Sequence, residues 1–263
     1  MIRVWLGMVV WGWVVCGLLR AEPPQLRVLS YNIHHGEGVD GRLDLERIAK
    51  VMQSYSPDLV CVQEVDRLVG RSKQVDQASE LGRLLNMSAI FEKNIDLQGG
   101  YYGNAILTKL PVLGHRNIGL PMVREGEQRG VLIAELYWPA IQQPFTVYST
   151  HLDHRPGDED RNAAAEKINT MVRDRSDSSL LLGDLNAVPE SQPLSILQEE
   201  WKRANSSPLP TIPVNKPTRQ IDYVLLRDLQ NRWKVVRVDV LDEEVASDHR
   251  AIGAVLQWDS KTN

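Results

Sequence analysis

Acidic and amide side chains follow a buried-looking segment near the middle of this 263-residue chain. The segment Gly183-Asp184-Leu185-Asn186 comes directly after the apolar run Leu180-Leu181-Leu182. A tight turn after a buried strand would hold Asp184 and Asn186 at the strand exit, where they could orient a water molecule or a ligand. Such a turn is also common without any function, so it needs support from other parts of the chain.

Polar residues also end, interrupt or precede other apolar runs. In chain order they are Asn32, Glu64, His151, Asp222 and the pair Asp248-His249. Ligands of α/β sheets bind outside the strand ends, so we expect these side chains to meet in one place. Carboxylates gathered so closely repel one another unless a cation lies among them.

The residue types indicate which cation this would be. The sequence holds no cysteine cluster and no paired-histidine helix motif, which disfavours zinc. One or two carboxylates with amides and waters suit Mg²⁺, which usually binds substrate phosphate at the same time. Mn²⁺ accepts the same ligands. We therefore expect Mg²⁺ or Mn²⁺ as the cofactor.

The hydrophobic pattern predicts the elements that position these residues. Residues 26–32 form a buried strand, and a stripe at Leu45, Ile48, Ala49 and Met52 predicts a helix that Asp44 caps and Ser56-Pro57 ends. Residues 58–63 form the next strand, so the first two strands should be parallel. Further strands are predicted at 105–107, 131–137, 145–150, 180–182, 221–226, 233–240 and 251–256, helices at 76–85, 158–172 and 194–199, and a proline-rich loop at 206–218.

The N-terminal residues have a different character from the rest. Arg3 precedes an almost wholly apolar run at 4–19, which is shorter than the ~20 residues that span a bilayer comfortably. This pattern predicts a signal peptide or N-terminal anchor at 1–21, then a linker at 22–25, a catalytic domain at 26–258 and a tail at 259–263. We expect the protein to be exported to the periplasm or the medium, or held at the membrane by an uncleaved leader.

Bulk composition narrows the function further. The formal net charge is −4, which argues against a protein that coats nucleic acid, although a local basic groove can lie within an acidic total. Cys61 lies within the apolar run 59–62, so we interpret it as a buried and inert thiol.

The polar segments, taken together, resemble the blocks of the endonuclease/exonuclease/phosphatase superfamily and its short bacterial branch. The matching segments are Tyr31-Asn32-Ile33-His34-His35-Gly36, Gln63-Glu64-Val65-Asp66, Tyr102-Gly103-Asn104-Ala105-Ile106-Leu107, Thr150-His151-Leu152-Asp153-His154, Gly183-Asp184-Leu185-Asn186-Ala187, Ile221-Asp222-Tyr223 and Ser247-Asp248-His249-Arg250. They run in the expected order from Leu26 to Leu256. The resemblance implies an α/β fold, a four-layer αββα sandwich of two mixed β-sheets flanked by helices.

The resemblance also implies a role for each residue. Glu64 would be the main metal carboxylate, Asn32 would support the metal or its waters, and Asp248 would be a second contact to the metal or to a histidine. Asp184 would orient or deprotonate the attacking water and Asn186 would steady it.

The remaining roles concern the phosphoryl group. His249 would be the catalytic histidine, which Asp222 orients, and His151 would lie on the leaving-group side. Asn104 and His35 would contact phosphate, although strand pairing for Asn104 and a solvated loop for His35 are alternative interpretations. Arg129 and Arg161 would brace the site or bind phosphate.

These roles predict a divalent-metal-dependent phosphoesterase that works by in-line attack of an activated water. A phosphodiester or a phospholipid head group is the favoured substrate, with proximity to a membrane and a monomeric state. A soluble sugar phosphate or inositol phosphate, a secreted endonuclease acting on DNA or RNA, and a non-catalytic binding module that retains the fold are the alternatives.

Overall fold

The computed structural model describes residues 22–259. The predicted leader at 1–21 and residues 260–263 of the predicted tail lie outside the described residues. Within the described range, none of the helices has the length and apolar character needed to cross a membrane.

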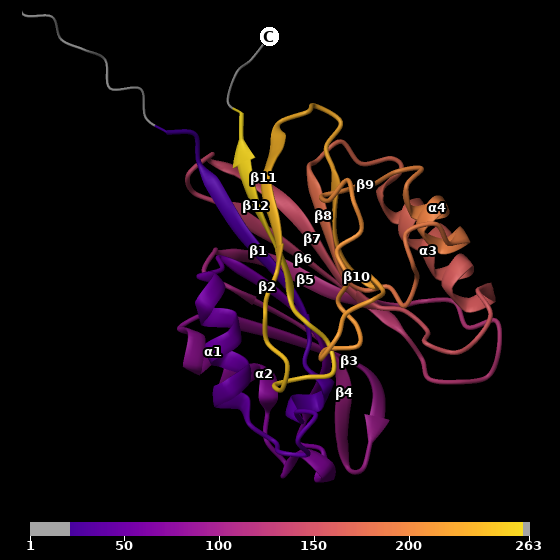
Figure 1. Cartoon of the computed structure of the whole chain (residues 1–263). Helices are drawn as coiled ribbons and strands as arrows, with labels where there is room; N and C mark the ends of the chain where they lie inside the picture. The colour runs from indigo at the N-terminus through magenta and orange to yellow at the C-terminus, as the bar shows by residue number, and fades with distance from the viewer. Residues whose placement is uncertain (1–21, 260–263) are drawn as a thin grey trace, which may run out of the picture.

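The described strands form two six-stranded sheets that pack face to face (Figure 1). The first has the order β11-β12-β1-β2-β4-β3 and the second the order β5-β6-β7-β8-β10-β9. The first contains β1 (Gln25–Asn32), β2 (Leu59–Arg67), β3 (Ser88–Leu97), β4 (Gly100–Thr108), β11 (Trp233–Val240) and β12 (Ile252–Trp258). The second contains β5 (Val112–Gly119), β6 (Gly130–Trp138), β7 (Gln143–His151), β8 (Ser179–Asp184), β9 (Lys202–Arg203) and β10 (Asp222–Arg227).

Helices cover the outer face of each sheet (Figure 1). On the first sheet they are α1 (Leu45–Tyr55) and α2 (Gln77–Leu85), and on the second they are α3 (Glu159–Val172) and α4 (Gln192–Leu197). Two short 3₁₀ turns, η1 (His34–Gly36) and η2 (Gly70–Ser72), lie in loops. The four-layer αββα sandwich of two mixed sheets is therefore confirmed.

Each sheet contains one parallel strand pair with a crossover helix. β1 pairs with β2 across α1, and β7 pairs with β8 across α3, while the other pairs are antiparallel. The side chain of Asp44 accepts a hydrogen bond from the backbone N–H of Arg47 at 2.8 Å, so the predicted cap of α1 is confirmed. The predicted parallel order of the first two strands is also confirmed.

Alternation along the strands divides the core into three apolar layers. One layer fills the space between the sheets and contains Val28, Cys61 and Leu182, and the other two lie under the helix pairs. Because side chains point to one face at every second residue, Asn32 and Asp184 continue the inward-facing rows of β1 and β8. The sheet pattern therefore delivers polar groups to the edge of the central layer.

Cys61 lies in that central layer and is 0% exposed. Burial raises the pKa of its thiol to about 12, which keeps it protonated and unreactive. The expectation of an inert thiol is confirmed.

The structure differs from the sequence-based expectations at several strands. We did not predict β3, β5 and β9, because the first two are edge strands with half-exposed, mixed sequences and the third has two residues. The expectation that Glu64 ends the second strand is also wrong. β2 continues to Arg67 past an irregularity between Val62 and Val65, and Glu64 there has a φ of +58°. This β-bulge turns the Glu64 side chain out of the regular alternation.

Candidate active site

Three predicted catalytic residues lie side by side on neighbouring strands. His151 of β7 is the register partner of Asp184 on β8, which is also the partner of Asp222 on β10. Residues opposite each other in a sheet point to the same face, so the three side chains meet at the edge of the central layer. All three are at least 96% buried.

Gly183 permits the close approach of the two strands that carry His151 and Asp184. A Cβ atom at this position would lie 2.0 Å from the carbonyl oxygen of Thr150 on β7. Any side chain there would push β7 and β8 apart. The glycine of the segment at 183–186 therefore sets the spacing of the site.

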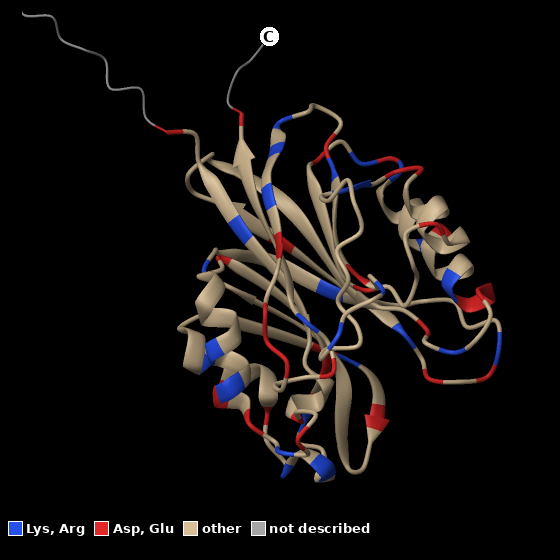
Figure 2. Cartoon of the chain, viewed as in Figure 1, with Lys and Arg blue, Asp and Glu red and all other residues tan. Residues whose placement is uncertain are grey.

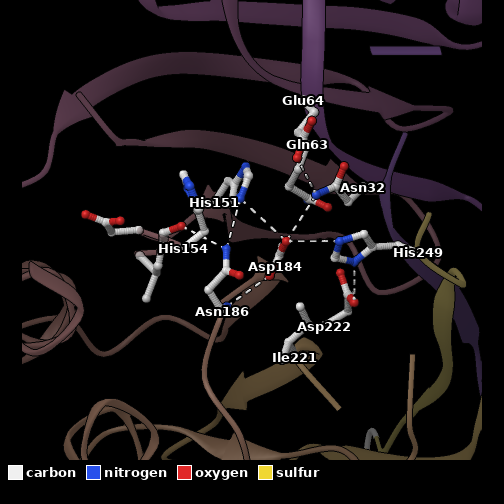
Figure 3. A network of polar contacts seen from close by, with 12 residues as sticks. Asn32, Gln63, Glu64, His151, His154, Asp184, Asn186, Ile221, Asp222 and His249 are labelled. Carbon is white, nitrogen blue, oxygen red and sulfur yellow. Dashed lines mark hydrogen bonds and ion pairs between the residues drawn. The ribbon is translucent and has the colours of Figure 1, made fainter. Parts of the chain in front are cut away.

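Asp184 is the centre of the polar network (Figure 3). Its Oδ1 accepts a hydrogen bond from the backbone N–H of Asn186 at 2.9 Å, and its Oδ2 accepts one from Nδ2 of Asn32 at 3.0 Å. Nε2 of His151 and Nε2 of His249 lie 3.5 Å and 3.6 Å from the same Oδ2. The turn at Asn186 has a φ of +46°, which asparagine tolerates better than most residues.

His249 is held between two carboxylates. Its Nδ1 lies 2.9 Å from Oδ2 of Asp222, which also accepts a hydrogen bond from Oγ1 of Thr211 at 2.6 Å. Burial alone would lower the pKa of His249, but the charges of Asp222, Asp184 and Asp248 raise it to about 10. Burial and the Asp222 charge raise the pKa of Asp184 to about 7, against the lowering effect of His249. At neutral pH His249 is therefore an imidazolium, and Asp184 beside it can accept or release a proton.

His151 has the opposite protonation state. Nη1 of Arg129 lies 3.1 Å from its Nδ1, and because arginine only donates, Nδ1 accepts and Nε2 carries the proton. Burial and the charge of Arg129 lower the pKa of His151 well below its ordinary value. Nδ2 of Asn186 lies 3.1 Å from this Nε2, but both nitrogens then carry protons, so the contact is not a hydrogen bond; the Asn186 amide donates to the carbonyl oxygen of Leu152 at 3.1 Å instead. The site therefore pairs one neutral and one charged histidine across a single aspartate.

The predicted metal residues lie on the opposite side of Asp184. Nδ2 of Asn32 donates to Oε1 of Glu64 at 3.0 Å as well as to Asp184, so one amide joins carboxylates of the two sheets. Among the described residues, two groups have ligand atoms within 4.8 Å of one another and could hold a metal ion. One group is His34, His35 and Glu64, and the other is Asp184, Asp222 and His249.

An open cleft of about 440 Å³ lies above these groups. Its lining residues are His34, Glu64, Arg71, Ile95, Leu97, Tyr102, Glu127, Arg129, His151, His154, Asp184, Asn186, Asp248 and His249. Sequence reasoning missed Arg71 and assigned no role to Tyr102, although Tyr102 belongs to one of the segments that carry the resemblance. The two residues form one wall, with the Arg71 guanidinium 5.3 Å from the Tyr102 ring centre. The alternation of β4 was a usable signal, because Tyr102 precedes Asn104 by two residues and shares its face. Arg71 lies in a loop without such a pattern.

The structure brings together seven of the ten predicted residues around Asp184. They are Asn32, Glu64, His151, Asp184, Asn186, Asp222 and His249. Asp248 lines the cleft from an exposed position, accepts a hydrogen bond from Ser247 at 3.3 Å, and lies outside both candidate metal groups.

Asn104 and His35 do not line the cleft. Asn104 donates to the carbonyl oxygen of Gly130 at 3.2 Å, so its side chain joins the two sheets. His35 lies beside Glu64 and His34 instead, and burial lowers its pKa. Arg129 braces His151, whereas Arg161 binds the backbone of the loop at 153–157.

The fold and site define a class of metal-dependent hydrolases, and comparison with known proteins identifies the family. A model of the Endonuclease/Exonuclease/phosphatase family matches residues 29–249, and the chain belongs to this family. Members act on phosphoester bonds with the help of a metal ion, so the chain is a metal-dependent phosphoesterase. A comparison with curated proteins found no significant match.

Solved structures share this fold at low sequence identity. An endonuclease/exonuclease/phosphatase from Beutenbergia cavernae has a TM-score of 0.72 at 24% identity, over 89% of this chain and 72% of that one. A mannosyl-6-phosphatase from Bacteroides thetaiotaomicron has a TM-score of 0.73 at 18% identity, over 89% and 100%. The human Nocturnin catalytic domain has a TM-score of 0.68 at 19% identity, over 90% and 94%. These likenesses support the shared fold.

Proposed function

We propose that the chain hydrolyses a phosphodiester by in-line attack of a water held at Asp184 and Asn186, with a divalent cation at Glu64. The observation that carries this proposal is the position of Asp184. It lies between the Asn32–Glu64 pair on one side and two histidines of opposite protonation on the other. Such an arrangement separates the group that accepts a proton from the groups that stabilise negative charge.

Each residue has its own part in the proposed hydrolysis. Asp184, with a pKa raised to about 7 by burial and by Asp222, accepts the proton of the attacking water. The N–H of neutral His151 and the amide of Asn186 face the same place and stabilise the phosphoryl oxygens. The bond to the leaving alkoxide breaks, and the imidazolium of His249 supplies its proton; His249 thus takes the leaving-group part that the resemblance implies for His151, because the lowered pKa of His151 leaves that ring neutral. A bound Mg²⁺ or Mn²⁺ would polarise the phosphoryl oxygens.

The residues near Glu64 fit a divalent cation. Oε1 of Glu64 is occupied by the Asn32 amide, and the half-buried carboxylate lines the cleft. Imidazole, carboxylate and amide groups together form a donor set that divalent ions use. In the Asp184–Asp222–His249 group, by contrast, Oδ2 of Asp222 bonds to His249 and Thr211, and the charges of Asp222 and Asp184 raise the pKa of His249 to about 10, so that this ring is protonated and has no lone pair for a metal. We therefore assign the cation to the side of Glu64.

The walls of the cleft support a substrate of modest size. Ile95, Leu97 and Tyr102 give it an apolar side, and Arg71 and Arg129 lie nearby. Arg71 is paired with Asp66 through two hydrogen bonds of 2.8 Å, and Arg129 with Glu127 at 2.8 Å, so neither is a free cation. A phosphodiester with a small polyol or lipid head group fits these walls better than an extended nucleic acid.

The endonuclease alternative needs a surface that follows a phosphate backbone. Lys and Arg are interspersed with Asp and Glu over the molecule, as Figure 2 shows. The formal net charge of −4 agrees with this mixture. The similar mannosyl-6-phosphatase gives a reason to include sugar phosphates among the tested substrates.

The test is a substrate panel in Mg²⁺, Mn²⁺ and Ca²⁺. It contains bis(p-nitrophenyl) phosphate, sphingomyelin, phosphoinositides, mannose 6-phosphate, and single- and double-stranded DNA. We expect turnover of the phosphodiesters, its loss in Asp184→Asn, and its retention in Asp174→Asn, which alters an exposed aspartate. Absence of any turnover in every metal would favour the non-catalytic binding module instead.

We also propose that residues 1–21 export the chain, which then acts as a monomer near a membrane. The support is the apolar run at 4–19 after Arg3. Fractionation of cells that express the full chain, followed by N-terminal sequencing of the product, tests both export and cleavage. Recovery in the cytoplasm with residues 1–21 intact would contradict this proposal.

A further inference from the structure

We propose that the metal centre of this chain is a nitrogen-containing His34–His35–Glu64 site, which selects a first-row transition ion such as Mn²⁺ over Mg²⁺. The ligand atoms of the three residues lie within 4.8 Å of one another. The inference rests on the proposed function, because Glu64 is the carboxylate that we assign to the cation there. It narrows the choice of metal from Mg²⁺ or Mn²⁺ to a transition ion, and it adds His34 and His35 as ligands.

All three residues have a left-handed backbone. His34, His35 and Glu64 have φ angles of +46°, +45° and +58°, a region that is uncommon outside glycine and that histidine adopts more often than most residues. Two of them form the 3₁₀ turn after β1 and the third lies in the bulge of β2, so two separate segments are distorted toward one point. Nine other described residues besides glycine also have a positive φ, so the observation that bears on a ligand site is the convergence of two such segments on one point.

One side chain holds these two segments together. Nε2 of Gln77, the first residue of α2, donates to the carbonyl oxygen of His35 at 2.6 Å. Its Oε1 accepts a hydrogen bond from the backbone N–H of Asp66 on β2 at 2.8 Å. The His35 backbone is therefore tied to the strand that carries Glu64, which fixes the ligands before an ion arrives.

The contacts of each ring leave one nitrogen available to a metal. Nδ1 of His34 lies 3.0 Å from the carbonyl oxygen of Glu37, which only accepts, so Nδ1 carries the proton and Nε2 is free to bind a metal. Nε2 of His35 lies 3.6 Å from a carboxylate oxygen of Glu37. Its Nδ1 is buried and has no hydrogen-bond partner among the described residues. Metal-binding histidines usually direct their second nitrogen at a carbonyl or carboxylate in this way.

Packing of the His34 and His35 rings against each other explains their arrangement less well than a bound cation does. The His34 and His35 rings contact each other with centres 4.5 Å apart and planes at 62°. Packing would not need a buried nitrogen without a partner, which costs free energy. It would also not need the same turn to point both rings at a carboxylate. A bound cation accounts for both features.

The donor set determines which cation binds. Mg²⁺ requires oxygen ligands and retains several waters. Imidazole nitrogens favour zinc, iron and other first-row transition ions, and Mn²⁺ accepts mixed nitrogen and oxygen ligands. Two imidazoles and one carboxylate therefore discriminate against Mg²⁺.

The direct test measures nitrogen at the metal. The full chain is loaded with Mn²⁺ in the absence of substrate, and pulsed electron paramagnetic resonance records the ¹⁴N couplings. We expect couplings from directly bound imidazole nitrogens. A bound Mn²⁺ surrounded by oxygen alone, or no Mn²⁺ binding, would overturn the inference, and neither result depends on a variant that has to fold.

Variants then assign the nitrogens. His34→Gln and His35→Gln should each weaken Mn²⁺ binding at least about tenfold, since even outer partners of metal ligands matter by that much. Mg²⁺ binding should change little, so the selectivity should fall. The matched control is His115→Gln, which changes a half-exposed histidine paired with Glu92 at 3.2 Å. Unaltered Mn²⁺ binding in both His34 and His35 variants, with the folded state verified by circular dichroism, would also overturn the inference.

The two proposals fail in different ways. Mn²⁺ with nitrogen couplings in a chain that hydrolyses nothing would contradict only the proposed function. Hydrolysis supported by a metal without nitrogen ligands would contradict only the His34–His35–Glu64 site.

Discussion

The two βαβ units supply the two sides of one site by different structural means. In β7-α3-β8 the side chains of His151 and Asp184 are register partners, and Asp222 continues the same row on β10. In β1-α1-β2 the corresponding side depends on a bulge at Glu64 and a distorted turn at His34 and His35. The first side is regular sheet and the second departs from it. Regular sheet register is thus sufficient to place the proton-transfer groups on one side. The proposed metal ligands on the other side depend on residues with a left-handed backbone.

The largest predicted effect comes from removal of the metal. Chelation should abolish hydrolysis, because in the proposed function a cation held at Glu64 would supply the polarisation of the phosphoryl oxygens. The apolar layers contain no proposed ligand, so far-UV circular dichroism should not change. Hydrogen exchange should accelerate at residues 33–37 and 63–65, where a bound ion would offset backbone strain, and not at 146–151 or 179–184.

If hydrogen exchange accelerated equally at 33–37 and 63–65 and at 146–151 and 179–184, the predicted difference between the two βαβ units would be wrong. Undiminished hydrolysis in the chelated protein would contradict the assignment of the cation itself. Readdition of Mn²⁺ serves as the control for irreversible damage.

The next largest effect concerns Asp184. Replacement by Asn retains the shape and removes the group that accepts the proton, so kcat should fall on the order of 10³-fold. Burial raises the pKa of this carboxyl to about 7, so its ionisation inside the protein is unfavourable near neutral pH. The Asn variant carries no such charge and should unfold at the same or a higher temperature. Steady-state kinetics and thermal denaturation measure the two quantities. A variant that loses stability together with activity would indicate a structural role.

The contrast between the two units also explains what could be predicted from sequence. The strand containing Leu180–Leu182 and the turn after it follow from apolar patterning, so Asp184 and Asn186 could be placed at a strand exit. Glu64 is expected from sequence at a strand end and its role comes only from the resemblance, because the bulge that turns its side chain is a tertiary feature that shifts the register within an otherwise apolar strand. The unpredicted Arg71 reaches the cleft through its bond to Asp66, and no sequence period records such a contact.

A smaller effect is expected from Asp222→Asn. This change removes the largest charge that raises the pKa of His249, so the pKa should fall from about 10 toward the ordinary 6.5. The alkaline limb of the kcat profile should move to lower pH, because the imidazolium that protonates the leaving group is lost earlier. An NMR titration of His249 alongside the rate profile measures both shifts. An unshifted titration would show that Asp222 does not control this histidine.

The pH dependence of stability gives an independent check on the interaction of His249 with Asp222. The pKa of His249 is higher in the folded state than the ordinary value, so the stabilisation is complete below about pH 6.5 and is lost as the pH rises through about 10. The wild type should therefore lose melting temperature between pH 7 and pH 10.5, and Asp222→Asn should lose less. The groups that face His249 from other elements are Asp222 of β10 and Asp184 of β8, and Asp248 is its neighbour in the chain.

The smallest effect should come from Asn104→Ala, which changes a side chain that links the two sheets outside both βαβ units. Its amide donates to the carbonyl oxygen of Gly130, and that oxygen also accepts a hydrogen bond from Oγ1 of Thr150 at 3.0 Å. Since the carbonyl keeps one partner, the free energy of unfolding should fall by only about 1 kcal/mol, with kcat/KM nearly unchanged. Denaturant unfolding and kinetics measure these values, with the exposed Asn215→Ala as the control. A large loss of kcat/KM at unchanged stability would instead support the predicted contact with phosphate, and would make Asn104 part of the site rather than a link between its two sheets.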